Sequence, residues 1–178
     1  GDNSTAFGSS TKATGSSSTA FGSITEANGP SGTAFGSGTM ANGQHSTAFG
    51  SSSIAAGYIS TAFGSNTQAG KLTYKKADGR EIEAKIVEYT TAAGDRKYKI
   101  VSLRNENDVL SNNNGEGFYY DDALKNSNLT KQGDYSTAFG SSTEALGDFS
   151  TAFGSNTKAT GDNSTAFGSS TKATGSSS

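Results

Sequence analysis

The chain of 178 residues contains no cysteine, a single histidine and no long apolar segment. Without cysteine, neither a disulfide nor a thiolate metal site can hold the fold, although an extracellular location remains possible. A formal net charge of −2 gives no electrostatic basis for binding nucleic acid or an anionic membrane. No apolar stretch approaches the ~20 residues of a membrane span, so we expect no membrane contact from this segment.

The residues of catalytic sites are also scarce. The single His45 lies in a variable turn, where we expect an ordinary surface residue, and no Ser-His-Asp arrangement is recognisable. Gly115-Glu116-Gly117 lacks the strand-to-helix context of a phosphate-binding loop. We therefore expect a protein that is not an enzyme and has no metal or cofactor site.

Hydrophobic residues make up only 31% of the chain, and composition alone would predict disorder. The compositional bias is periodic, however, and a strict repeat takes precedence over composition. The pentapeptide Thr-Ala-Phe-Gly-Ser occurs eight times, with steps of fourteen residues inside each block. It begins at Thr5, Thr19, Thr33, Thr47, Thr61, Thr137, Thr151 and Thr165.

The charge distribution separates a second region from these repeats. The step from Thr61 to Thr137 is 76 residues, so 62 residues are inserted into one coil. The segment 71–132 holds 11 of the 14 Lys and Arg residues and 10 of the 16 Asp and Glu residues. We predict repeat coils over 1–70, an inserted β-rich motif over 71–132 and further coils over 133–178. Residues 1–17 have the same sequence as 161–177, which favours a fragment of a longer array.

Each fourteen-residue coil has room for two short strands separated by glycine-centred turns. We expect the first strand near Ser4–Gly8 and the second near Thr11–Thr14. Stacked coils then pair equivalent strands about 4.8 Å apart, which predicts an all-β parallel solenoid with two facing sheets. In the second strand, Lys12 and Thr14 should point outward because that column also carries charged residues in other coils.

The first strand allows two arrangements. If Ala6 and Gly8 point inward, the interior contains only small residues, and an exposed phenylalanine column would drive self-association. If Thr5 and Phe7 point inward, sheets about 10 Å apart could hold the ring and a monomer could be stable. We favour the first arrangement because an inward phenylalanine would leave Ala-Gly as a bare outer face with no reason to be invariant.

The unit Ser-Thr-Ala-Phe-Gly-Ser, followed by Thr-x-Ala-x-Gly at a step of fourteen, resembles the head repeat of YadA-like trimeric autotransporter adhesins. The resemblance covers about 116 of the 178 residues. It implies a left-handed parallel β-roll in each chain, three of which pack around an apolar axis as a homotrimer. Thr and Phe here replace the Val and Ile of the family unit, and the heptads of the family's coiled-coil stalk do not occur.

The resemblance also assigns residues and a function. The position that faces the trimer axis falls on Phe7, Phe21, Phe35, Phe49, Phe63, Phe139, Phe153 and Phe167. It implies an adhesin head on the surface of a Gram-negative bacterium, anchored in the outer membrane by a C-terminal region outside this sequence. The implied partners are host matrix proteins such as collagen, fibronectin or laminin, or a receptor of the carcinoembryonic-antigen-related class.

The inserted segment has the alternation of a β-meander. We expect strands over 72–76, 81–89 and 97–103, joined by turns at Ala77-Asp78-Gly79 and Ala93-Gly94-Asp95. A polar loop is expected over 105–117, followed by Phe118-Tyr119-Tyr120 and a helical turn near 121–125. The three aromatic residues are either part of the meander core or a binding surface.

Apolar residues also replace polar ones in the coils next to the inserted segment. They are Met40, Ile54, Tyr58 and Ile59 before it, and Tyr135, Leu146 and Phe149 after it. Two hypotheses fit this clustering, a docking surface for the inserted motif and an exposed receptor-binding patch.

Two other functions suit a β-solenoid. Stacked threonines such as Thr5, Thr19 and Thr33 resemble the ladders of ice-binding solenoids, although each lies two residues from a phenylalanine. A purely structural spacer in a longer surface fibre is the third possibility.

Overall fold

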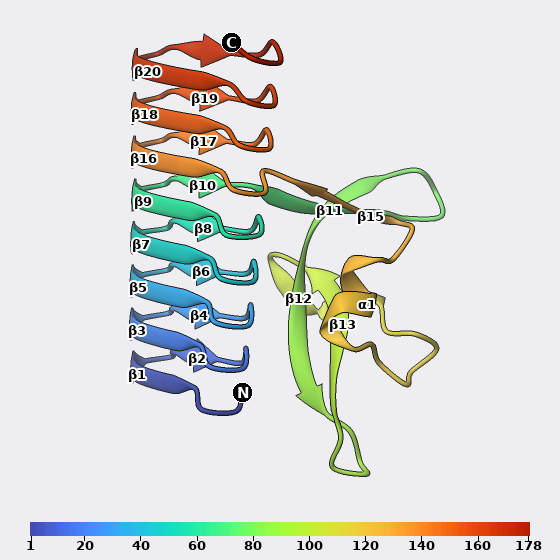
Figure 1. Ribbon diagram of the computed structural model, residues 1–178. Coiled ribbons are helices and arrows are strands. Elements are labelled where there is room, and N and C mark those ends of the chain that lie inside the picture. The colour runs from blue at the N-terminus through green and yellow to red at the C-terminus, as the bar shows by residue number, and fades with distance from the viewer. The chain divides into compact units, whose positions relative to one another are not determined.

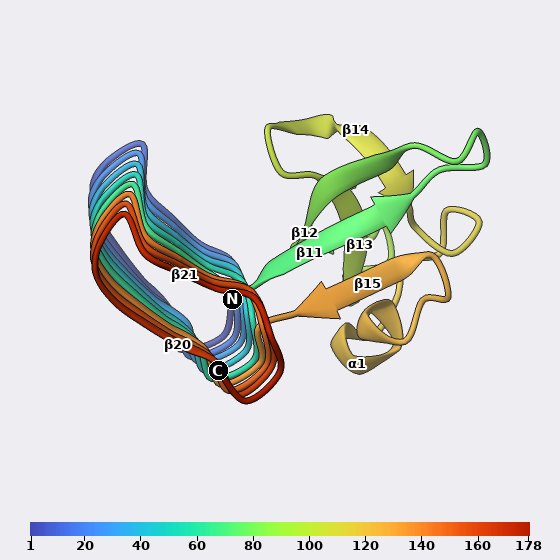
Figure 2. The ribbon, with the colours of Figure 1, turned by 90° about the horizontal axis from the view of Figure 1, so that it is seen from above.

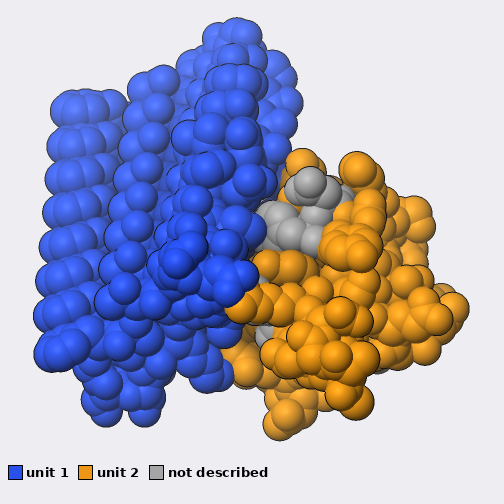
Figure 3. Space-filling model, turned by 60° about the horizontal axis from the view of Figure 1, so that its bottom comes forward, with its two compact units in different colours: residues 1–71, 132–178 blue, residues 72–131 orange. Residues whose placement is uncertain are grey.

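The computed structural model describes residues 1–87, 89–119 and 122–178. The chain forms two compact units, which Figure 3 shows in different colours. The first, called the roll, contains Gly1–Lys71 and Gln132–Ser178. The second, called the insertion unit, contains Leu72–Lys131.

The roll consists of two parallel eight-stranded sheets, to which each coil contributes one long and one short strand (Figures 1 and 2). The long strands are β1 (Thr5–Ser9), β3 (Thr19–Ser23), β5 (Thr33–Ser37), β7 (Thr47–Ser51), β9 (Thr61–Ser65), β16 (Thr137–Ser141), β18 (Thr151–Ser155) and β20 (Thr165–Ser169). The short strands are β2 (Lys12–Ala13), β4 (Glu26–Ala27), β6 (Met40–Ala41), β8 (Ile54–Ala55), β10 (Gln68–Ala69), β17 (Glu144–Ala145), β19 (Lys158–Ala159) and β21 (Lys172–Ala173). The fourteen-residue solenoid predicted from the repeat is confirmed.

The strands pair so that identical residues lie side by side. Thr19 pairs with Thr33 and Phe21 with Phe35, and the same register continues from coil to coil. It also holds where the chain is interrupted, because Thr61 of β9 pairs with Thr137 of β16. The 62-residue interruption in sequence therefore leaves the ladder of the roll unbroken.

The interior of the roll is filled by small side chains. Alanines of both sheets form one core cluster in which most members are fully buried, among them Ala20, Ala27 and Ala48. The phenylalanines of the same long strands are exposed instead. Burial thus confirms the favoured arrangement, in which Ala points inward and Phe outward.

The small interior depends on glycine at one position of each long strand. Gly22 has φ +132°, a conformation that residues with a Cβ rarely adopt, and an added Cβ would overlap the carbonyl oxygen of Gly36 in the next coil. The turns are closed by side chains as well, since the Ser60 hydroxyl donates to the Gly57 carbonyl oxygen over 2.8 Å. The close approach of the coils explains why the repeat allows so little variation at this Gly position.

The insertion unit forms a five-stranded sheet in the order β14 (Asn105–Ser111), β13 (Arg96–Ser102), β12 (Glu81–Thr90), β11 (Lys71–Lys75) and β15 (Leu129–Gln132). A short helix, α1 (Tyr120–Leu124), contacts β13. Its buried core is Leu72, Tyr74, Ala84, Ile86, Ile100, Ala123 and Leu129. The expected meander and helical turn are present.

The expected polar loop over 105–117 is wrong in its first half. Residues 105–111 form strand β14, which pairs antiparallel with β13. The two-residue turn at Leu103-Arg104 places Asn105 opposite Ser102, so main-chain pairing forms despite the polar sequence. The register shifts on both sides of Val101, and this irregular pairing left no clean alternation in the sequence.

Candidate interaction surfaces

The eight phenylalanines of the long strands form one continuous ladder on the surface of the roll. Adjacent ring centroids lie 4.7–5.1 Å apart, and the rings are within 13° of parallel. In the six coils from Phe21 to Phe153, each residue remains 37–42% exposed. Because the spacing follows the strand spacing, the ladder is a flat apolar stripe along the whole roll.

A second column lies in the turn that leads into each long strand, two residues before the repeated Thr. The eight copies, and Ser177 at the equivalent place after β21, have a left-handed backbone, with φ between +49° and +62°. Asn or Ser occupies five of them, Asn3, Ser17, Ser31, Asn163 and Ser177. Four consecutive copies instead hold His45, Ile59, Tyr135 and Phe149.

These four residues and the adjacent Tyr58 are called the turn patch. The rings of Tyr135 and Phe149 stack at 4.8 Å and 4°, and Tyr58 contacts Tyr135 edge-on at 5.5 Å. His45 contacts Tyr58 edge-on at 6.0 Å. Ile59, Tyr135 and Phe149 are 42%, 45% and 60% exposed, so the patch presents apolar surface to solvent.

His45 was expected to be an ordinary surface residue, yet it belongs to this aromatic column. The signal was its position, because His45 precedes Ile59 by one coil in the same column as Tyr135 and Phe149.

Aspartates lie beside the turn patch, one position earlier in the turn. The Asp134 carboxylate accepts the backbone N–H of Tyr58 over 2.9 Å. Asp148 accepts from Gly133 and Asp134 over 2.9 and 3.0 Å, and Asp162 accepts from Asp148 over 3.0 Å. One oxygen of each carboxylate is thus fixed to the turn of the preceding coil.

The other apolar exceptions of the roll lie elsewhere. Met40 and Ile54 are half-buried and pair in neighbouring strands β6 and β8 of the short-strand sheet, and Leu146 is half-buried directly after β17. The sequence grouped them with Tyr58, Ile59 and Phe149, whereas the structure separates a strand pair from a turn column. Their role as a docking surface for the inserted motif stays a prediction.

The aromatic triplet of the insertion unit is also divided. Phe118 is half-buried, packs against the core cluster and bridges to Tyr98 of β13. Tyr119 is 67% exposed, and the Lys97 ammonium lies 3.8 Å from its ring centroid. Tyr120 lies outside the described residues.

A cavity of about 630 Å³ adjoins Tyr119. Its lining includes Asp95, Lys97, Glu116 and Asp122, together with the Gly115–Gly117 turn. It thus combines side chains of both charges with the exposed ring of Tyr119.

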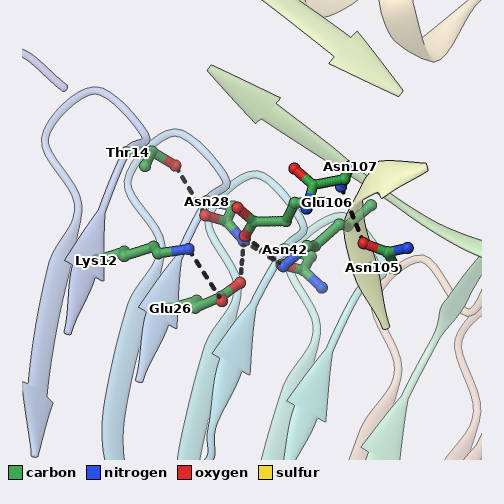
Figure 4. A network of polar contacts seen from close by, with 9 residues as sticks. Lys12, Thr14, Glu26, Asn28, Asn42, Asn105, Glu106 and Asn107 are labelled. Atoms are coloured by element: carbon green, nitrogen blue, oxygen red, sulfur yellow. Dashed lines mark hydrogen bonds and ion pairs between the residues drawn. The ribbon is translucent and has the colours of Figure 1, made fainter. Parts of the chain in front are cut away.

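The outer face of the short-strand sheet carries a polar network (Figure 4). Asn28 accepts from the Thr14 hydroxyl over 2.8 Å and donates to Glu26 and Asn42 over 3.0 and 2.9 Å. Lys12 lies 3.8 Å from Glu26. The contacts of Asn28 with Thr14 and Asn42, and that of Lys12 with Glu26, join neighbouring coils, so the network stabilises the stacking.

Charged side chains of the insertion unit pair between its strands, as Lys85 of β12 does with Glu106 of β14 over 2.9 Å, and within its turns. The pKa of the Asp78 carboxyl lies below its ordinary value, mainly because the carboxyl accepts a hydrogen bond from the backbone N–H of Arg80. The Arg80 guanidinium, which donates to it over 2.7 Å, lowers the pKa further.

Among the described residues, no group of three or more His, Asp or Glu side chains is placed to hold a metal ion. Within the same residues, no helix has the length and apolar character that crossing a bilayer requires.

A family model described as the YadA head domain repeat matches most of the roll. The matched residues are 1–23, 13–39, 27–53, 41–67, 132–157 and 159–178. No curated protein matches the chain.

Proposed function

The chain belongs to the YadA head family, whose members are heads of trimeric autotransporter adhesins, and on this premise we propose that it attaches a bacterium to host surfaces. The partners we propose are host matrix proteins, such as collagen, fibronectin or laminin, or a receptor of the carcinoembryonic-antigen-related class. Binding is protein to protein and multivalent, because a trimer presents three copies of each surface.

Multivalent binding requires assembly of several chains, and the observation that supports assembly is the phenylalanine ladder. A soluble monomer rarely leaves so long a continuous apolar stripe exposed. Full burial of a Phe side chain contributes roughly 1.5–3 kcal/mol, and about two fifths of each of the six inner Phe residues, and more of Phe7 and Phe167, remains to be buried. Eight rings then supply on the order of 5–10 kcal/mol per chain toward assembly. We therefore propose a homotrimer with Phe7 to Phe167 along its axis.

We also propose a location. The family places such heads at the cell surface, and the proposed anchor is an outer-membrane region C-terminal to this sequence.

The first test measures assembly. Sedimentation equilibrium of the intact chain should give three times the chain mass, and replacing Phe35 and Phe49 by Thr should weaken the trimer at least tenfold. The matched control replaces Thr33 and Thr47 by Val, which changes neighbouring outward positions of the same strands without removing a ring. A monomer that is fully folded and does not associate would contradict the proposal.

The second test measures adhesion. Immobilised collagen, fibronectin, laminin and a carcinoembryonic-antigen-related receptor are presented to the intact chain and to a chain that lacks Lys71–Gln132. We expect at least one surface to retain the intact chain. If it also retains the chain that lacks the segment, binding belongs to the roll; if it does not, binding belongs to the insertion unit. Failure of the folded trimer on every surface would leave the spacer function as the better explanation.

Ice binding is the competing function because the outward threonines are in register along the whole roll, from Thr5 paired with Thr19 to Thr151 paired with Thr165. The stripe differs from a paired Thr-x-Thr surface, since the next outward residue of each strand is a phenylalanine. Thermal hysteresis of the intact chain decides between the two functions, and we expect none.

A further inference from the structure

The turn patch is a place where the fold holds unfavourable residues. Asn tolerates the left-handed conformation, whereas β-branched and bulky residues are rarely found in it. Ile59 has φ +49°, Tyr135 +56° and Phe149 +55°. The column could hold Asn or Ser in these coils, as it does in the others.

The backbone of these turns is determined by the roll rather than by the side chains. The backbone N–H of Ile59 donates to the Gln44 carbonyl oxygen over 2.9 Å. The backbone N–H of Phe149 donates to the backbone carbonyl oxygen of Asp134 over 2.8 Å. Equivalent bonds join the turns of other coils, and the turns stack in register (Figure 1). The ladder therefore imposes the left-handed conformation on whatever residue stands there.

Core packing does not explain the bulky residues either. Their side chains extend to solvent, and no member of the patch belongs to the alanine core cluster. Strained residues that persist without a packing role are typical of functional sites.

The chemistry around the patch indicates the partner. Asp134, Asp148 and Asp162 occupy the neighbouring column in three successive coils, and neither column contains Lys or Arg in any coil. Exposed faces of Tyr and Phe attract apolar groups and planar cations, and the adjacent carboxylates favour the same cations.

We propose that the turn patch binds a segment of a partner protein that carries arginine beside apolar side chains. Arginine satisfies both halves of the surface, because its guanidinium can stack on the Phe149 ring, the most exposed apolar side chain of the patch, and pair with a neighbouring carboxylate. This deepens the proposed function and rests on it only for the patch being displayed at a cell surface.

The probe is an acetylated, amidated pentapeptide of alternating leucine and arginine, added to the intact chain while nuclear magnetic resonance follows backbone amides. We expect shifts at His45, Ile59, Tyr135 and Phe149 that fit a single weak site and weaken as salt is raised. A peptide with citrulline in place of arginine has the same shape without charge and should bind about tenfold more weakly.

The decisive variant replaces Ile59 and Phe149 by Asn, the residue that the column holds elsewhere. Peptide binding should fall at least tenfold, while Tm stays level or rises by about 2–4 °C because strain is relieved. Ser17→Asn is the matched control in the same column and should leave binding unchanged. A Tm that falls by more than about 4 °C would show that the patch is packed for stability, which overturns the proposal.

The charge requirement is tested separately. Asp148→Asn with Asp162→Asn keeps an oxygen for each turn hydrogen bond and removes both charges, so affinity should drop several-fold with little change in Tm. Asp2→Asn is the control in the same column. Equal binding of the citrulline peptide, or of this variant, would point to an apolar or glycan ligand and would overturn the proposal.

Light scattering of the same samples separates this inference from the proposed assembly. If the chain is an intact trimer but the peptide shifts none of its amide resonances, the arginine site is overturned and the trimer is not. A monomer that binds the peptide overturns the trimer alone. Dissociation of the trimer by Ile59→Asn with Phe149→Asn would assign the patch to contacts between chains, against the inference.

Discussion

Single residues of the roll are constrained by how closely its two sheets approach. The interior accepts methyl groups such as those of Ala20 and Ala48, which are fully buried. The outward positions of the same strands accept a ring, because they meet only the equivalent ring of the next coil. Ala and Phe thus alternate in one strand because Ala faces the packed interior and Phe faces the outer surface of the sheet.

The interior should tolerate no added volume. We expect Ala48→Val to lower the free energy of unfolding by about 1–3 kcal/mol, because two extra methyl groups must displace packed backbone. Thermal unfolding measures this as a Tm lower by several degrees. Thr33→Val, on the exposed face of the neighbouring strand, should change Tm by less than about 2 °C. Equal effects of both substitutions would contradict the tightly packed interior.

At the scale of elements, the hairpin of β11 and β12 offers a test by pH. Asp78 accepts hydrogen bonds from the backbone N–H of Arg80 and from its guanidinium, so its pKa lies below the ordinary value. A carboxyl with a lowered pKa in the folded state stabilises the hairpin above its unfolded pKa, and this contribution is lost as pH falls through the folded pKa.

The titration can be followed at the Asp78 carboxyl carbon by nuclear magnetic resonance. Arg80→Gln should raise the pKa of Asp78 only part of the way to its ordinary value, because the backbone donor remains. Arg104→Gln serves as the control for a general loss of positive charge. An unchanged Asp78 pKa in Arg80→Gln would assign the whole shift to the backbone.

The elements of the roll were predictable, and those of the insertion unit only in part. A repeat of fourteen residues sets strand, turn and register together, because any other register would break the alanine and phenylalanine columns. Strand β14 was missed because its pairing with β13 is irregular, and strand β15 because Leu129–Gln132 is short and mostly polar.

The turn patch was predicted as a group of apolar exceptions but not as a structure. Sequence columns revealed that Ile59 and Phe149 differ from Asn3 and Ser17. They did not reveal the sign of φ, which is set by hydrogen bonds between coils. For the same reason His45 was assigned no role, and Met40 was grouped with residues from which the structure separates it.

At the scale of the molecule, the inserted segment leaves and rejoins the roll at adjacent points. A Cβ added to Gly133 would overlap the Cα of Gly70, and both glycines have positive φ, +77° and +70°. Removing the 62 residues between them restores a coil of fourteen. The roll therefore keeps the strand pairing of an uninterrupted solenoid across the junction, although the Gly133 N–H donates to the Asp148 carboxylate rather than to an alanine carbonyl.

We expect a chain in which Gly70 is joined directly to Gly133 to fold as a roll of eight coils. Its Tm should differ from that of the roll in the intact chain by less than about 4 °C, because the pairing of β9 with β16 is unchanged. Circular dichroism on heating measures this. A control that removes one residue more, Gly133, shortens the coil to thirteen and should lower Tm markedly. Unfolding of the direct junction would mean that the roll needs the inserted residues.

The meeting of Gly70 and Gly133 also has a mechanical consequence. When the two ends of the roll are pulled apart, tension passes from coil to coil through the paired strands, including β9 with β16 and β10 with β17. The inserted residues lie outside this load path, although the covalent chain runs through them. They should bear force only after these two strand pairs have ruptured, and a single-molecule stretching trace should then show their length released as one late step.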